Sequence, residues 1–412
     1  MTITDVATDA SGLVDGWSPS YEDVTAEEVI ARARAVAPLL RPLQADTEAR
    51  TYYSAETHEL FRRAGFYRIL TPRRYGGFEF SIDTFFKVAM ALGSGCASSG
   101  WQYCLGHSHT LTFATFWDKE VQDEIFSGGP DFLAPGTVKP QGQATRLPNG
   151  DWELSGVWNY CSGVPYSSWF VSHTLQADSG EPMLFIAPRD RWTMLDDWGN
   201  QLGLKGTGSH SIRMDKAVIP ARYAKPGVHL FYVDVHADGV TPGRALHGNP
   251  QYGASPYAYA LIETAAIGVG MAQNAMTVFE EMMTTKTTVF APFNRRVDDI
   301  DYQRWFGLGY GKVITAEAVI IAATEQMVEI ARQNAFTPEL DRRIVAMACE
   351  ALDLCWDAVQ IFFRYSGSGS IVNGTPMERV WRDMSTLRAH SGLLYFVEIS
   401  KRELTQAHFT NT

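Results

Sequence analysis

Residues Gly203–Pro220 read GLKGTGSHSIRMDKAVIP and combine a cluster of glycines with an alternating pattern. Its glycines are spaced G-x-x-G-x-G, whereas a dinucleotide-binding fingerprint has G-x-G-x-x-G between a strand and a helix. Residues 211–220 alternate apolar and polar side chains and end at a proline, which is typical of a strand and not of a helix. No Gly-Lys-Ser/Thr sequence opens a helix here, so a P-loop is excluded as well. The stretch therefore predicts a glycine-rich turn between two strands.

The regions on either side of this turn predict three domains. Short runs rich in β-branched and aromatic residues, separated by Pro and Gly, fill residues 131–226 and predict a small antiparallel sandwich or barrel. Residues 1–130 predict a helical domain, with Thr25 and Ser54 as expected N-caps. Residues 227–412 predict an irregular connecting loop over 227–250 and then four long helices, which suit a four-helix bundle. Several of these helices are apolar on more than one face, so we expect them to pack against other subunits.

Composition excludes several classes of partner. The 412 residues carry a net charge of -11, which argues against a nucleic-acid partner. The five cysteines are odd in number and form no C-x-x-C pair, so we expect a reducing cytoplasm and neither a disulfide framework nor a metal site. No basic and apolar leader opens the chain, and no run of about 18 apolar residues occurs, so we expect neither a signal peptide nor a membrane partner.

Four segments together carry a resemblance to a known family. They are the turn, the helical segment SSGWQYCLGHSH (Ser98–His109), the segment SGVWNYCSGVPYSSW (Ser155–Trp169) and the segment GSGSIVNGTPMERVWRDMSTLRAH (Gly367–His390). In this order they resemble the oxygenase components of two-component flavin-dependent monooxygenases. The resemblance spans most of the chain after residue 24. It implies the acyl-CoA dehydrogenase fold, which has an N-terminal helical domain, a small central β-domain and a C-terminal four-helix bundle.

The same resemblance implies an activity. Such an enzyme uses reduced FAD or FMN and O2, by way of a C4a-hydroperoxyflavin, to hydroxylate an aromatic or heteroaromatic substrate such as a phenol, an indole or a polycyclic ring, in natural-product or catabolic metabolism. A separate NAD(P)H:flavin reductase supplies the reduced flavin, which agrees with the missing dinucleotide fingerprint. The resemblance further implies a cytoplasmic homotetramer whose flavin site is completed across subunits.

Three residues match the family's catalytic positions. His390 matches an active-site histidine, and a histidine suits a general base because it titrates near neutrality. His109 matches a histidine that faces the substrate, with His107 as the alternative on the same helix. Ser162 matches a serine at the N5 edge of the flavin. The structural alternatives are histidines satisfied within the core and a serine that completes a turn.

Further positions match the family's cofactor contacts. The turn would offer backbone N–H groups and hydroxyls to the flavin, and glycines there allow close approach. Arg304, beside Gln303, would reach the flavin phosphate of a neighbouring subunit. Arg379, Arg382 and Asp383 either form an internal ion pair, with Arg379 and Asp383 spaced i,i+4, or contact the flavin. Trp158 and Tyr160 are predicted to share one face of a strand, where they stack near the flavin or fill the barrel. The complete predicted cofactor set is Gly136, Thr137, Trp158, Tyr160, Ser162, Lys205, Thr207, Gly208, Ser209, Arg304, Gly369 and Arg382.

Three other functions compete with this reading. An acyl-CoA dehydrogenase-type FAD oxidoreductase needs a carboxylate base, and no acidic residue follows Gly367–Ser370 in the expected context. A nitrogen or sulfur oxygenase on the same scaffold fits the same motifs. A binding protein without catalytic activity would not need the flavin-facing segments.

Overall fold

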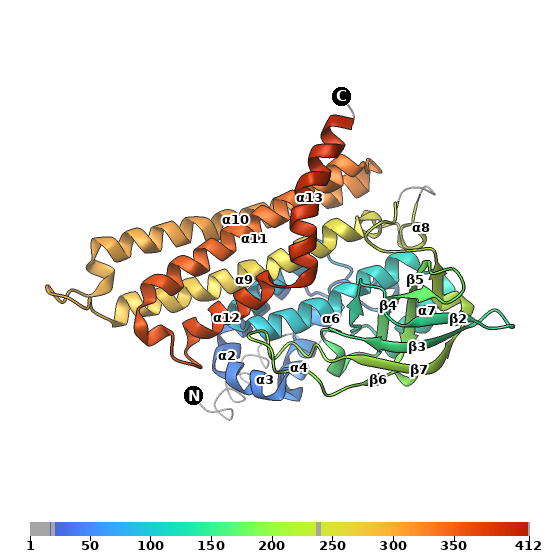
Figure 1. The fold of residues 1–412 in the computed structure, drawn as a ribbon, viewed down its shortest axis with the longest axis horizontal. Helices are drawn as coiled ribbons and strands as arrows, with labels where there is room; N and C mark the ends of the chain where they lie inside the picture. Colours follow the sequence, from blue (N-terminus) through green and yellow to red (C-terminus); the bar gives the residue numbers. More distant parts are fainter. Residues whose placement is uncertain (1–16, 18–20, 236–239, 411–412) are drawn as a thin grey trace.

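The computed structural model describes residue 17, residues 21–235 and residues 240–410. Parts of the predicted N-terminal domain (1–16 and 18–20) and of the connecting loop (236–239) lie outside the described residues. The described chain forms a helical N-terminal region, a central sheet and a long C-terminal bundle, in that order (Figure 1). This order agrees with the predicted succession of helices, strands and helices.

The N-terminal helices begin where the sequence predicts them. Thr25 caps the first of them by accepting a hydrogen bond from the backbone N–H of Glu28, and Ser54 caps another by accepting from Thr57. The helices are α2 (Ala26–Leu40), α3 (Gln44–Arg50), α4 (Ala55–Arg63), α5 (Ile82–Gly95), α6 (Ala97–Phe116) and α7 (Lys119–Ile125).

Glycines let α5, α6 and α9 (Pro256–Thr285) approach one another closely. A Cβ added at Gly100 would lie 2.6 Å from the Cα of Gly93, and a Cβ added at Gly270 would lie 3.0 Å from that same Cα. The chain therefore needs glycine at these crossings, and α6 runs between the sheet and the bundle as a shared core helix (Figure 1).

The central region is one eight-stranded sheet with the strand order β6-β7-β3-β2-β4-β5-β8, and β1 pairs with β4. The prediction of an antiparallel sheet holds for most pairs, but β1 and β2 both pair with β4 in parallel. The strands are β1 (Gly136–Thr137), β2 (Gln143–Arg146), β3 (Trp152–Trp158), β4 (Trp169–Gln176), β5 (Pro182–Pro188), β6 (Thr193–Met194), β7 (Ile212–Ile219) and β8 (Ala224–Pro226). The residues of Gly203–Ser211 lead directly into β7, as predicted.

The C-terminal region differs from the prediction in two places. The connecting segment is not wholly irregular, because Thr241 caps a short helix, α8 (Pro242–His247). The predicted fourth helix is broken into α12 (Pro376–Arg388) and α13 (Ser391–Thr410), with Ala389 and His390 between them. The bundle is completed by α9, α10 (Ile300–Gln333) and α11 (Pro338–Ser366).

Helix α10 is unusually exposed for an apolar helix. By length and composition alone it could cross a membrane, and 28% of its most apolar window is buried. Helices of soluble proteins can have the same length and apolar composition, so these two properties do not identify α10 as a membrane-spanning helix. In a helical bundle, an exposed apolar face equally suits contact with another chain.

Candidate functional site

The glycine-rich turn is packed against three other parts of the chain. A Cβ at Gly203 would lie 2.3 Å from the carbonyl oxygen of Arg382, and one at Gly206 would lie 2.5 Å from a methyl group of Thr47. Gly208 has a φ of +58°, a conformation that favours glycine. The glycine pattern therefore follows from close packing of the turn between domains.

The backbone N–H groups of this turn are largely used within the protein. Leu204 donates to Asp383 Oδ1 at 2.6 Å, Gly206 donates to Ser98 Oγ at 3.2 Å, and Gly208 donates to the carbonyl of Thr51 at 2.7 Å. The expectation that the turn offers its N–H groups to a cofactor does not hold for these three.

The hydroxyl groups of the turn form a buried chain with Ser162. Ser162 Oγ lies 2.7 Å from Ser209 Oγ, and Ser209 Oγ lies 2.7 Å from Thr207 Oγ1. Thr207 donates to the carbonyl of Leu204 at 3.0 Å, and Trp101 donates its indole N–H to Ser162 Oγ at 2.9 Å. We call this arrangement, from Trp101 through Ser162, Ser209 and Thr207 to the Leu204 carbonyl, the hydroxyl chain. It joins α6, the segment after β3 and the turn.

His109 lies about two turns after Trp101 on α6 and is held in one tautomer. Its Nδ1 lies 2.7 Å from the carbonyl of Leu105 and 3.0 Å from that of Ala134, so Nδ1 carries the proton. Burial lowers the pKa of His109, which keeps the ring neutral. Its Nε2 has no partner among the described residues, and an added Cβ at Gly136 would lie 2.5 Å from it. His109 therefore presents a free acceptor beside β1.

His107, the alternative, is fully engaged in the core. It is 0% exposed, its Nδ1 lies 2.9 Å from the carbonyl of Phe132, and its Nε2 accepts from the backbone N–H of Leu70. Burial lowers its pKa to about 4. The geometry thus favours His109 as the residue available to a ligand.

His390 lies in the break between α12 and α13 and not within a helix, which corrects the prediction. Its ring centroid is 5.9 Å from that of Trp101. Solvent reaches the residue, but protein surrounds the imidazole on most sides, and this desolvation lowers its pKa below the ordinary 6.5. Its side chain makes no hydrogen bond in the described part of the chain. Trp101 therefore links His390 to the hydroxyl chain.

The charged residues of α12 form a network that the sequence did not predict. Arg379 and Arg382 both pair with Glu48, and Arg382 also donates to Glu378 and to the carbonyl of Leu202. Asp383 instead accepts from the turn, and burial raises its pKa to about 7. The expected i,i+4 pair of Arg379 with Asp383 is not formed. Nothing in the sequence near Glu48 marks it as the partner, because it lies more than 300 residues away.

Trp158 and Tyr160 do not share a face. Strand β3 ends at Trp158, and Tyr160 follows with a φ of +65°, outside the strand. Trp158 is 0% exposed and packs between Phe170 and Phe185, so it fills the sheet core. Tyr160 is 64% exposed.

The remaining predicted residues do not belong to the hydroxyl chain. Thr137 bonds Ser172 at 2.7 Å beside His109, and Lys205 is half-buried in the turn without an ion pair among the described residues. Arg304 and Gly369 are exposed. The structure thus gathers Trp101, Ser162, Thr207, Ser209 and His390, with His109 further along α6.

The segment after β8 contributes aromatic side chains that pack against β4, α9 and α13. His229 stacks on His173 of β4 with ring centroids 4.5 Å apart. Phe231 packs against Tyr257 of α9 and Phe396 of α13, and these three line a pocket. The loop therefore borders a pocket that is lined by both aromatic and charged side chains, although its sequence showed no pattern.

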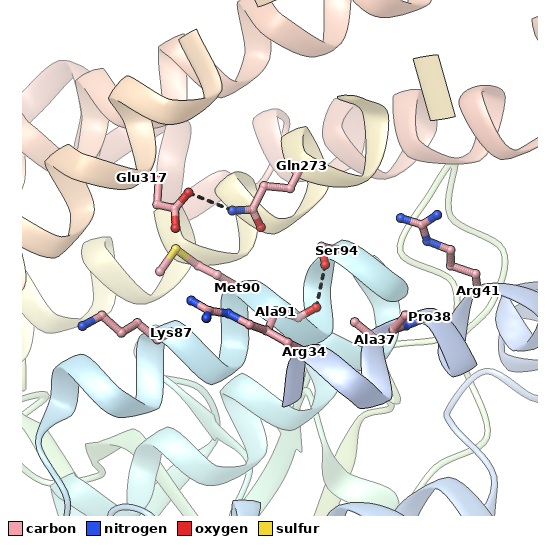
Figure 2. Close-up of a pocket in the computed structure, with 10 residues that line it drawn as sticks. All are labelled: Arg34, Ala37, Pro38, Arg41, Lys87, Met90, Ala91, Ser94, Gln273 and Glu317. Atoms are coloured by element: carbon pink, nitrogen blue, oxygen red, sulfur yellow. Dashed lines mark hydrogen bonds between the residues drawn. The ribbon is translucent and has the colours of Figure 1, made fainter. Parts of the chain in front are cut away.

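A separate cleft lies between α2, α5, α9 and α10 (Figure 2). Arg34, Arg41 and Lys87 line it together with Glu317, which accepts a hydrogen bond from Gln273. None of the predicted site residues lines this cleft. Arg41 and Lys87 are paired with carboxylates, whereas Arg34 and Glu317 form no ion pair within the described chain.

Comparisons with known proteins agree with this architecture. Residues 262–395 match the family described as acyl-CoA dehydrogenase, C-terminal domain. The chain is 25% identical to a flavin-dependent monooxygenase, oxygenase subunit HsaA, from Rhodococcus jostii, covering 87% of this chain and 93% of that protein. It is 22% identical to the oxygenase component of p-hydroxyphenylacetate 3-hydroxylase from Acinetobacter baumannii, covering 93% and 90%.

A solved structure covers nearly the whole chain. XiaF from a Streptomyces species, in complex with FADH2 and glycerol, superposes with a TM-score of 0.83 at 21% identity and covers 98% of each chain. The predicted acyl-CoA dehydrogenase fold is therefore confirmed. Within that fold, the chain is a homologue of the oxygenase components of flavin-dependent monooxygenases.

Proposed function

We propose that this chain is the oxygenase component of a two-component monooxygenase. It uses reduced FAD or FMN and O2 to hydroxylate an aromatic or heteroaromatic substrate, and a separate NAD(P)H:flavin reductase supplies the reduced flavin. The observation that carries the proposal is the junction at Trp101, where the hydroxyl chain and the unpartnered His390 meet. Homology to oxygenase components over about nine tenths of the chain supports it.

The residues at this junction suit a flavin ring. Ser162 retains a free lone pair, and Lys205 carries a charge without a partner in the described chain, as a phosphate contact requires. A bound reduced flavin, reacting with O2, would supply the oxygen atom and the electrons for the hydroxylation. Thr207 and Ser209 would act on the ring through Ser162, because their own hydroxyls are used in the hydroxyl chain. A contact of Gly208 with the cofactor remains a prediction.

Two neutral histidines would bind the substrate and accept its proton. His390, with its lowered pKa, would accept the proton of a phenol O–H or an indole N–H, which makes the ring more electron-rich. His109 would orient the substrate by accepting a hydrogen bond at Nε2.

The exposed face of α10 supports association with another copy of the chain, and the family resemblance implies that the assembly is a homotetramer. Ile300, Leu308, Tyr310 and Ile314 are each more than 40% exposed, and they lie on one side of the helix, since 3.6 residues make one turn. Arg304 lies within this face. A neighbouring copy that covers the face would bring Arg304 toward the neighbour's flavin phosphate. The positions of Gly369 and Arg382 as cofactor contacts, the three-domain boundaries and a cytoplasmic location remain predictions.

A single-turnover experiment tests the proposed activity. The protein is mixed anaerobically with reduced FMN or FAD and a panel of phenols and indoles, and ¹⁸O2 is then admitted. We expect one labelled oxygen atom in an aromatic product, detected by mass spectrometry. Firm retention of FAD with electron transfer to an acceptor dye would support an acyl-CoA dehydrogenase-type enzyme instead. A labelled N-oxide or sulfoxide from a matching substrate would show nitrogen or sulfur oxygenation.

A further inference from the structure

The hydroxyl chain has a direction that its end groups determine. The indole N–H of Trp101 can only donate, and the carbonyl of Leu204 can only accept. Each hydroxyl between them has one proton to donate. Thr207 gives its proton to Leu204, so the proton between Thr207 and Ser209 belongs to Ser209. The proton between Ser209 and Ser162 then belongs to Ser162.

Ser162 consequently has no proton left for a ligand. Its hydroxyl donates inward to Ser209, it accepts from Trp101, and one lone pair remains. The side chains are shielded from water, since Trp101 is 6%, Ser162 7%, Ser209 4% and Thr207 1% exposed. Solvent therefore does not readily replace these partners.

The opposite direction is possible but makes one bond fewer. If Thr207 donated its proton to Ser209, the hydrogen bond from Thr207 to the Leu204 carbonyl would be lost. That carbonyl would then accept only from the indole N–H of Trp198, at 3.2 Å. The chain is thus biased toward the direction in which Ser162 is an acceptor, and Thr207 maintains that bias without itself touching Ser162.

We propose that Thr207, through this chain, makes the site select reduced flavin over oxidised flavin. The inference rests on the proposed function. A reduced isoalloxazine ring carries N–H groups at ring positions where the oxidised ring has only lone pairs. If Ser162 acts as an acceptor, it can accept a hydrogen bond from an N–H group of the reduced ring. Against the oxidised ring, the Ser162 lone pair would face a nitrogen lone pair, and no hydrogen bond could form. Thr207 is a positioning residue for the redox state of the cofactor.

The test measures dissociation constants and not turnover. Oxidised and dithionite-reduced FMN and FAD are titrated anaerobically into the full chain and into Thr207→Val. Without the Thr207 hydroxyl, Ser209 has only Ser162 left to donate to, so the Ser162 proton turns toward the ligand. We expect the ratio of the oxidised to the reduced dissociation constant to fall about tenfold, as one hydrogen bond implies.

Matched variants separate this effect from a packing defect. Thr207→Ser keeps the hydroxyl and should restore the ratio. Thr324→Val removes a buried hydroxyl in α10, which donates to the Ile320 carbonyl, and should leave the ratio unchanged. If Thr207→Val does not fold, Ser209→Ala frees the same Ser162 proton and should lower the ratio likewise.

The outcomes distinguish the two proposals. An unchanged ratio in a variant that still binds flavin overturns the role of Thr207 and leaves the proposed function standing. Failure of the unaltered chain to bind reduced flavin overturns both.

Discussion

At the scale of single residues, a substitution tests the proposed role of His390 as a general base. We expect His390→Asn to lower the amount of hydroxylated product per flavin oxidised by about 100-fold or more, because a general base contributes a factor of this order. Flavin binding should be retained. The measurement is product yield and hydrogen peroxide yield in single turnovers, with the flavin dissociation constant as the control.

The same residue predicts a pH dependence. The base works only as the neutral imidazole, which exists above its pKa, and desolvation by the surrounding protein holds that pKa below 6.5. Hydroxylation should therefore persist at pH 6.5 and decline at lower pH as the ring is protonated. A variant without His390 should lack this decline. If it shows the same acid limb, another group is responsible.

Gly136 offers a test of His109. A methyl group at position 136 would lie 2.5 Å from the Nε2 of His109, so Gly136→Ala must displace the imidazole from the position in which its free nitrogen points toward β1. We expect weaker substrate binding, measured by titration at saturating flavin because Gly136 is itself among the predicted cofactor contacts. Gly128→Ala is the matched control, since an added Cβ there meets nothing within 4 Å. Equal substrate affinity in both variants would contradict the role of His109.

Local signals predicted some residues well and others not at all. The caps at Thr25 and Ser54 were predictable because a cap bonds within its own helical turn. The face occupied by Tyr160 was not, because the strand ends two residues earlier at Trp158. The choice between His107 and His109 required the carbonyls of Phe132 and Ala134, which approach the helix from a distant segment.

At the scale of elements, α9 contains a buried acid whose protonation affects stability. Glu263 is 5% exposed and lies against Cys104 of α6, and burial raises its pKa to about 8 from 4.5. The folded state thus binds this proton more tightly than the unfolded state does. The resulting stabilisation is complete below pH 4.5 and is lost as the pH rises through about 8.

Replacing Glu263 by glutamine should remove this loss of stability at high pH. We expect Glu263→Gln to raise the free energy of unfolding at pH 8, on the order of 4 kcal/mol, and to change it little near pH 4. Denaturant titrations at both pH values measure the difference. A stabilisation that is equal at the two pH values would show that Glu263 does not titrate between them.

The succession of elements followed from sequence periodicity, but two breaks did not. Short α8 was not predicted because six residues give too little periodicity. The break at Ala389 and His390 was not predicted because apolar residues continue across it. The parallel pairing of β1 and β2 with β4 depends on contacts between segments that lie apart in the chain.

At the scale of the whole molecule, the exposed face of α10 predicts the assembly. We expect light scattering to give four times the mass of one chain, and Ile314→Asp to lower it, because a charge in a buried apolar interface is costly. Flavin affinity should fall in the same variant, since Arg304 would then leave the neighbour's site. Ser179→Asp, in the exposed turn between β4 and β5 and away from α10, controls for added charge. A tetramer that survives Ile314→Asp would place the interface elsewhere.

The bond between Leu204 and Asp383 joins positions 179 residues apart. On the ribosome, the β-domain emerges long before α12 is synthesised, and domains tend to fold as they emerge. Until position 383 has left the exit tunnel, the Leu204 amide lacks its partner and the turn lacks its clamp. The nascent chain can therefore complete its sheet early, but it assembles the site only after α12 has emerged as well.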